Sequence, residues 1–100
     1  MEEIRIIYHT DEFDEFYKSL DITVQAKFDR IIAMICTVYP INTKFVKKLV
    51  NSELYEMRVS VGYNEYRTIL FSVNHSNIIE ATKIVLLNGF LKKSNKDYEK

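Results

Sequence analysis

Residues 54–93 constrain the fold most, because their pattern predicts consecutive antiparallel strands separated by short turns. The predicted strands cover residues 54–61, 65–73 and 78–90. Turn-forming residues separate them, with Gly62-Tyr63-Asn64 after the first strand and Asn74-His75-Ser76-Asn77 after the second. The last strand contains the apolar run Ile84-Val85-Leu86-Leu87 and is apolar on both faces, so we expect it to be a central strand of the sheet.

The chain before this sheet predicts one strand and two helices. Residues 1–9 contain a strand, which we expect in the middle of the sheet or lying on it. Residues 10–39 show apolar side chains at helical spacing and predict a helical hairpin, with Thr10 and Asp21 as N-caps. Pro40 ends the second helix, because proline disfavours a helical residue before it. Residues 41–52 predict a connector that includes a short turn of helix.

Composition places these elements in one α+β domain that spans residues 1–100. Hydrophobic residues make up 47% of the chain, which is ordinary for a globular protein. The sequence shows neither a signal peptide nor an apolar run near the ~20 residues that span a bilayer, so we expect no membrane partner. Its one cysteine, Cys36, fits a reducing cytoplasm rather than a disulfide framework. Ligand-type residues show no metal-binding spacing, so we expect neither a metal nor another cofactor.

Charge is divided unevenly along a chain that is neutral overall. Residues 1–43 contain four Lys and Arg against eight acidic residues, a net charge of −4. Residues 44–100 contain ten Lys and Arg against six acidic residues, a net charge of +4. Overall neutrality argues weakly against a nucleic-acid-binding protein, whereas a basic half on one sheet argues weakly for one.

The relative orientation of Arg58 and Arg67 depends on the turn between their strands. A three-residue loop at 62–64 places Val59 opposite Arg67 and turns Arg58 to the other face. A four-residue loop places Arg58 opposite Arg67, so that both guanidinium groups share a face. The first register matches apolar residues better, while the second concentrates charge that an anion would have to balance. A β-bulge would reconcile the two, and the sequence leaves the choice open.

Three motifs follow one another in the sheet region. They are Leu54-Tyr55-Glu56-Met57-Arg58, Tyr66-Arg67 and Leu87-Asn88-Gly89-Phe90-Leu91-Lys92-Lys93. Together with the preceding strand and helical hairpin, they resemble the RelE/ParE toxin superfamily, most closely its HigB-type, phage Gp49-like branch. The resemblance covers essentially the whole chain. It implies a RelE-like fold, in which an N-terminal strand, a helical hairpin and a three-stranded antiparallel meander complete a four-stranded sheet, followed here by a tail at 94–100.

The function implied by the resemblance is that of a toxin in a type II toxin–antitoxin system. RelE-like and HigB-like members cut mRNA on the ribosome without a metal, through attack of a 2′-hydroxyl on the adjacent phosphate. Such chemistry needs a proton acceptor, cations for the transition-state phosphorane and a proton for the leaving oxygen. The implied partners are a cognate antitoxin, expected to contain a helix-turn-helix, mRNA on the ribosome and, with the antitoxin, operator DNA. A second class stays open, a non-catalytic ParE-like inhibitor that binds DNA gyrase or another protein.

The resemblance also assigns roles to individual residues. Arg67 is the expected stabiliser of transition-state charge, because a planar guanidinium grips two phosphate oxygens and stays charged. Lys93 matches a basic position after the last strand, and Arg58 is expected to hold the phosphate or to balance Glu56. The proton acceptor is Glu56 or a perturbed lysine, since Leu54 and Glu56 replace the lysines of RelE-like members. The expected RNA contacts are Lys47, Lys48, Lys92 and Tyr98.

Overall fold

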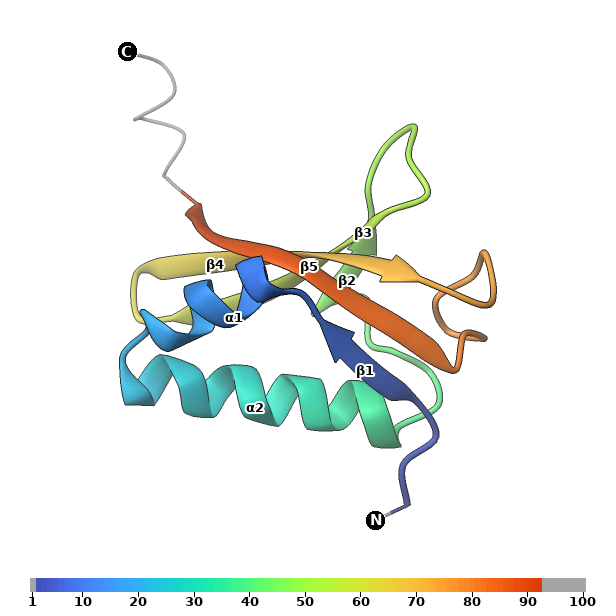
Figure 1. Cartoon of the computed structure of the whole chain (residues 1–100), viewed down its shortest axis with the longest axis horizontal. Helices are drawn as coiled ribbons and strands as arrows, with labels where there is room; N and C mark the ends of the chain where they lie inside the picture. The colour runs from blue at the N-terminus through green and yellow to red at the C-terminus, as the bar shows by residue number, and fades with distance from the viewer. Residues whose placement is uncertain (1, 93–100) are drawn as a thin grey trace.

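The computed structural model describes residues 2–92 as a five-stranded mixed sheet with two helices (Figure 1). Its elements are β1 (Ile6–His9), α1 (Asp11–Lys18), α2 (Ile22–Thr37), β2 (Val46–Lys48), β3 (Tyr55–Val61), β4 (Asn64–Ser72) and β5 (Lys83–Lys92). The strands lie in the order β1-β5-β4-β3-β2. Lys93, Tyr98 and the predicted tail at 94–100 lie outside the described residues. No helix within the described part is long and apolar enough to cross a membrane.

The α+β class is confirmed, but the four-stranded sheet is wrong at both edges. β1 pairs in parallel with β5, so it lies at one edge of the sheet rather than in the middle. β2 forms the other edge, in a segment for which the sequence predicted a connector with a turn of helix. Three residues are too few to show strand periodicity. A parallel pair that joins Ile6 to Lys83 leaves no local signal either.

Both helices begin where capping residues predict. The Thr10 hydroxyl accepts a hydrogen bond from the Phe13 N–H at 3.2 Å, which stabilises the first turn of α1. Asp21 precedes α2, but its side chain makes no capping hydrogen bond. α2 ends at Thr37, two residues earlier than predicted, and Val38 is already extended.

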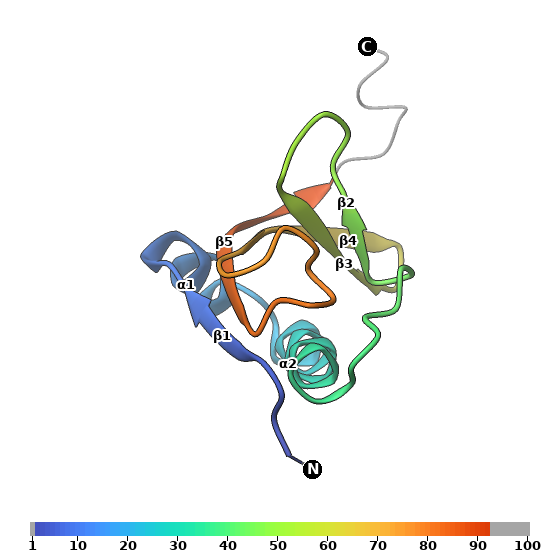
Figure 2. The same cartoon turned by 90° about the vertical axis from the view of Figure 1, so that its right-hand side faces the viewer.

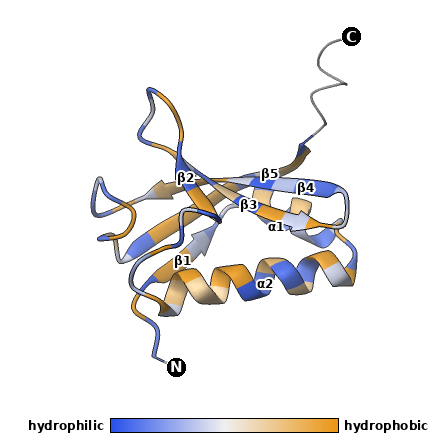
Figure 3. Cartoon of the chain, turned by 180° about the vertical axis from the view of Figure 1, so that it is seen from behind, coloured by the Kyte–Doolittle hydropathy of each residue, from blue (hydrophilic) through white to orange (hydrophobic). Residues whose placement is uncertain are grey.

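The hydrophobic core lies between the helices and one face of the sheet, which we call the inner face. Hydrophobic and hydrophilic bands alternate along α2 (Figure 3), and its buried residues lie on the side that contacts the sheet. Phe16 of α1 and Phe28 of α2 both contact Tyr66 of β4, with ring centroids 6.4 and 6.1 Å apart. The two helices therefore cover the same face, and no helix of residues 2–92 lies on the other, outer face (Figure 2).

Gly89 in the third motif has a packing role. A Cβ atom at this position would lie 2.2 Å from Cδ2 of Phe16, closer than any real contact allows. The absent side chain thus lets α1 approach β5 closely, and this part of the motif is explained by the fold.

Arg5, which precedes β1, connects its own segment to two others, which supply its hydrogen-bond acceptors. It is buried, and its guanidinium donates hydrogen bonds only to backbone carbonyl oxygens. The acceptors are Ala81, Ile35, Val38, Tyr39 and Ile79. Burial lowers the pKa of Arg5. Carbonyls at the C-terminal end of α2 carry partial negative charge and compensate the buried cation.

Candidate functional site

The turn between β3 and β4 sets the register of the candidate site. Val61 pairs with Asn64, which leaves a two-residue loop that begins with Gly62 at φ 60°. A glycine at the first loop position is typical of type II′ hairpins, whose backbone needs this positive φ. The register aligns Arg58 with Arg67. It is the charge-concentrating register of the two that the sequence left open.

Four charged side chains share the outer face and form what we call the arginine–glutamate cluster. Its members are Glu56 and Arg58 on β3, and Glu65 and Arg67 on β4. Successive side chains of a strand point to opposite faces, so the residues between them point inward. Those neighbours, Met57, Val59 and Tyr66, are buried against the helices. Arg58 and Arg67 therefore act from the same side of the sheet.

Glu56 lies between the two arginines. Its Oε1 is 3.3 Å from Arg58 Nε and 3.2 Å from Arg67 Nε. The Arg58 N–H donates to the Phe45 carbonyl at 2.7 Å, away from β4, so Arg58 and Arg67 form a non-hydrogen-bonded pair. Side chains approach most closely in such pairs, and like charges there repel. The Glu56 carboxylate offsets this repulsion.

Arg67 is buried and paired with carboxylates on two sides. In addition to Glu56, it reaches Glu65, whose Oε1 lies 3.3 Å from Arg67 Nη1. The side chain of Glu65 is 51% exposed, against 17% for Glu56 and 36% for Arg58. The cluster has no net charge, and Glu65 is the partner that water reaches most easily.

Two lysines flank the cluster on neighbouring strands. Lys47 of β2 pairs with Glu56, and Lys92 of β5 pairs with Glu65, so both lie on the outer face. Lys48 pairs with Tyr55, whose side chain belongs to the inner face, so Lys48 does not join the cluster. Of the predicted RNA contacts within residues 2–92, Lys47 and Lys92 are thus near the arginines and Lys48 is not.

The carboxylates of the cluster limit the chemistry that it can perform in this arrangement. Both guanidinium groups contact Glu56 Oε1, so this oxygen accepts a proton more readily once one arginine has moved away. Over residues 2–92, no group of three or more His, Cys, Asp or Glu side chains could hold a metal ion. The arrangement is suited to binding anions by exchange of an existing carboxylate.

Sequence reasoning missed a second set of cations, which lies beside the cluster. Lys27 and Arg30 of α2, with Lys44, line a hollow of about 500 Å³ that also contains Arg58. Lys27 is half-buried and Arg30 is exposed. Their i, i+3 spacing, which places both on one helix face, was the available signal.

Comparison with protein families gives one match. The family described as "Phage derived protein Gp49-like (DUF891)" matches residues 11–100. The match includes both helices and all the strands of the antiparallel part, together with the four residues of the arginine–glutamate cluster. Comparison with curated proteins and with solved structures gave no significant match.

Proposed function

Since the chain belongs to the Gp49-like family of phage-derived proteins, a RelE-like toxin family, we propose that it is the toxin of a type II toxin–antitoxin pair. We propose further that it inhibits translation as a metal-independent, ribosome-dependent mRNA endoribonuclease. The supporting observation is the register that places Arg58 opposite Arg67 on the outer face. With Lys47 and Lys92, this register puts cations on four adjacent strands.

RNA enters the site by displacing Glu65 from Arg67. In this ion pair the Glu65 side chain is 51% exposed, so water can replace the contact that its carboxylate gives up. A phosphate that gains charge in the transition state is a stronger ligand for guanidinium, because it accepts two parallel hydrogen bonds. Arg67 therefore exchanges a weak carboxylate contact for the phosphorane, and this exchange favours the transition state over the resting protein.

Arg58 supplies the second contact to the same phosphate. Its side chain is 36% exposed and has room to turn outward. This movement removes one of the two contacts on Glu56 Oε1, which then accepts the proton of the attacking 2′-hydroxyl. Lys92, opposite Glu65, lies on the side of Arg67 from which the RNA backbone approaches.

Mapping of mRNA 5′ ends by primer extension, after brief expression of the chain, tests the proposal. We expect cuts aligned with codons in cells that express the natural chain, and their loss with Arg67→Ala. Lys48→Ala is the matched control, because Lys48 is exposed but lies off the outer face. Growth arrest without cuts would reject the nuclease.

A non-catalytic ParE-like inhibitor is the second candidate, favoured by the carboxylates that already neutralise both arginines. In that case the cluster holds the sheet together, and toxicity comes from binding DNA gyrase or another protein. Purified chain would then inhibit DNA supercoiling by gyrase in vitro. It would leave translated mRNA intact.

A partner antitoxin follows from either function. We expect the adjacent gene to encode it, with a helix-turn-helix domain, and the pair to bind its own operator DNA. Co-expression of that gene should relieve the growth arrest. A reporter fused to the shared promoter should be repressed by the pair and less so by either protein alone.

A further inference from the structure

A groove runs between α2 and the edge of β3, and of its lining the proposed nuclease uses Arg58 and Glu65 alone. Two adjoining hollows form this groove, and they share Lys27, Arg30 and Ser60. One has a volume of about 600 Å³ and extends to Gly62. The other has a volume of about 500 Å³ and extends to Phe45. The shared residues make them one elongated depression along α2.

The groove is cationic. Its basic residues are Lys27, Arg30, Lys44 and Arg58, and within the described part of the chain its one carboxylate is that of Glu65. Among residues 2–92, no carboxylate oxygen lies within 4 Å of a charged nitrogen of Lys27, Arg30 or Lys44. Charges of one sign in a depression raise the local concentration of opposite charge. The expected occupant is therefore anionic.

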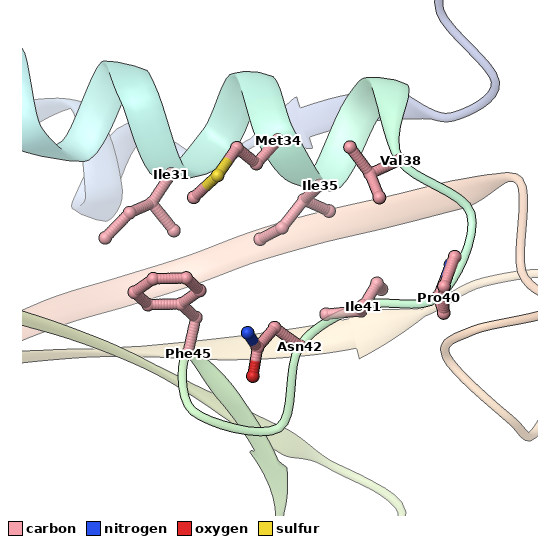
Figure 4. Close-up of a pocket in the computed structure, with 8 residues that line it drawn as sticks. All are labelled: Ile31, Met34, Ile35, Val38, Pro40, Ile41, Asn42 and Phe45. Carbon is pink, nitrogen blue, oxygen red and sulfur yellow. The ribbon is translucent and has the colours of Figure 1, made fainter.

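An apolar pocket continues the groove at the C-terminal end of α2. The pocket has a volume of about 210 Å³, and Figure 4 shows side chains of α2 facing those of the following connector across it. It is lined by Ile31, Met34, Ile35, Val38, Pro40, Ile41, Asn42 and Phe45, of which Ile31, Met34 and Phe45 also line the groove. Nucleobases need hydrogen-bond partners as well as stacking surfaces, and this lining is mostly aliphatic. It favours an apolar side chain of a peptide.

Among residues 2–92, no strand pairs with the edge of β3 that borders the groove beyond Met57. β4 pairs with β3 through Val61, whereas β2 pairs only with residues 55–57. Residues 58–61 therefore lack a second neighbour strand within the described part of the chain. The Arg58 N–H points to this side and already donates to the Phe45 carbonyl. By strand alternation the backbone of Ser60, an exposed residue, points the same way and is the open part of the edge. Such an edge is a template for an added strand.

We propose that this groove binds an extended, acidic segment of a partner protein. The segment pairs with β3 at Ser60, places carboxylates against Lys27, Arg30 and Lys44, and inserts one apolar side chain beside Phe45. The geometry favours a peptide over RNA because the open strand edge and the aliphatic pocket serve a peptide backbone and side chain. Binding does not require RNA cleavage, so the inference stands apart from the proposed nuclease.

Fluorescence anisotropy with labelled synthetic peptides tests the groove. The probe is a peptide of alternating glutamate and leucine, and the matched peptide replaces each glutamate by lysine. We expect the acidic peptide alone to bind, and the double variant K27E/R30E to weaken it at least about tenfold. Lys18→Glu, an exposed charge reversal on α1, should leave its affinity unchanged.

A second variant tests the strand edge. Ser60→Pro removes the N–H that faces the groove, and proline is tolerated at an edge position. We expect about fivefold weaker peptide binding, a loss of one backbone hydrogen bond, with an unaltered circular dichroism spectrum. If K27E/R30E does not fold, K27Q/R30Q at several salt concentrations replaces it, because loss of charge should lower the salt dependence.

Three results would overturn the inference. The first is equal binding of the acidic and basic peptides, and the second is full affinity in Ser60→Pro. The third is tighter binding of a single-stranded RNA oligonucleotide that K27E/R30E abolishes and Ser60→Pro spares, which would assign the groove to RNA. None of these measurements reads RNA cleavage, so each leaves the proposed nuclease untouched.

Discussion

Arg5 and Arg67 are almost equally buried, at 2% and 3% exposure, yet their surroundings differ in kind. Arg5 is held by five backbone carbonyls from two segments, residues 35–39 and 79–81, and none of them can leave without unfolding its segment. Arg67 is held by two carboxylates on flexible side chains, one of them half exposed. Burial alone therefore does not separate a structural arginine from a functional one. What separates the two is how easily the partners of the arginine can be exchanged.

The largest effect is expected from replacing Arg5. Arg5→Met leaves several buried carbonyls without a donor, so the free energy of unfolding should fall by about 3–5 kcal/mol. Arg67→Met, the matched change, should cost about 1–2 kcal/mol, because Glu65 can turn to water. Urea denaturation followed by circular dichroism measures both. A smaller loss for Arg5→Met than for Arg67→Met would reverse the comparison.

Function should depend on Arg67 far more than stability does. Arg67→Lys keeps the positive charge but loses the planar fork that grips two phosphate oxygens. Removing one such transition-state contact typically slows catalysis about 10²–10³-fold, so mRNA cuts should nearly disappear. Quantitative primer extension on cells with matched protein levels provides the measurement. Undiminished cleavage in Arg67→Lys would show that its burial between carboxylates is structural, like that of Arg5.

The two glutamates should differ in the same sense as the two arginines. Glu56→Gln removes the anion between Arg58 and Arg67 and should lower the free energy of unfolding by about 1–2 kcal/mol. Glu65→Gln should cost less, about 0–1 kcal/mol, since the Glu65 carboxylate is 51% exposed and Glu56 still pairs with Arg67.

Added sulfate provides a further test of the difference in stability between Glu56→Gln and Glu65→Gln. It stabilises proteins generally, so wild type and Glu65→Gln report the general effect. Glu56→Gln should gain more than either of them, because the added anion replaces the lost carboxylate between the arginines. Equal gains in all three chains would mean that the cluster does not take up an anion.

Local sequence patterns predict much of the fold. The helical spacing after Thr10 and the turn residues around Gly62 place the helices and two of the strands within a few residues of their observed bounds. The apolar run in β5 correctly predicts a strand with neighbours on both sides. Local patterns do not predict the two edge strands. β2 is too short for periodicity, and β1 finds its partner 77 positions away, through packing that no local pattern encodes.

The sequence predicts which residues form the candidate site, but not which face they share or how they pair. Arg58 and Arg67 stand out in the sequence, yet a one-residue difference in the turn decides whether they share a face. Their pairing with Glu56 depends on that register. Arg5 carried no signal, because a lone arginine just before a strand gives no hint of carbonyls that come from distant segments.

The smallest effect concerns Cys36, whose carbonyl accepts from the Ile4 and Arg5 backbone N–H groups at 2.7 and 3.1 Å. Burial raises the pKa of its thiol above the ordinary value of 9.0. The stability gained from a protonated thiol is therefore complete below pH 9.0 and is lost as the pH rises through the folded-state pKa. Little reactive thiolate should be present at pH 8, and alkylation by iodoacetamide should be slow.

The same thiol reports whether the two regions open separately. Arg5→Met should accelerate alkylation of Cys36 at pH 8, because it loosens the segments around the thiol. Arg67→Met perturbs the opposite face of the sheet and should leave the rate close to that of the natural chain. Mass spectrometry follows both reactions in folded protein. If the two variants accelerate alkylation equally, the fold opens as a single unit. The exchange of partners at Arg67 would then be coupled to the segments whose carbonyls accept hydrogen bonds from Arg5, rather than confined to the outer face.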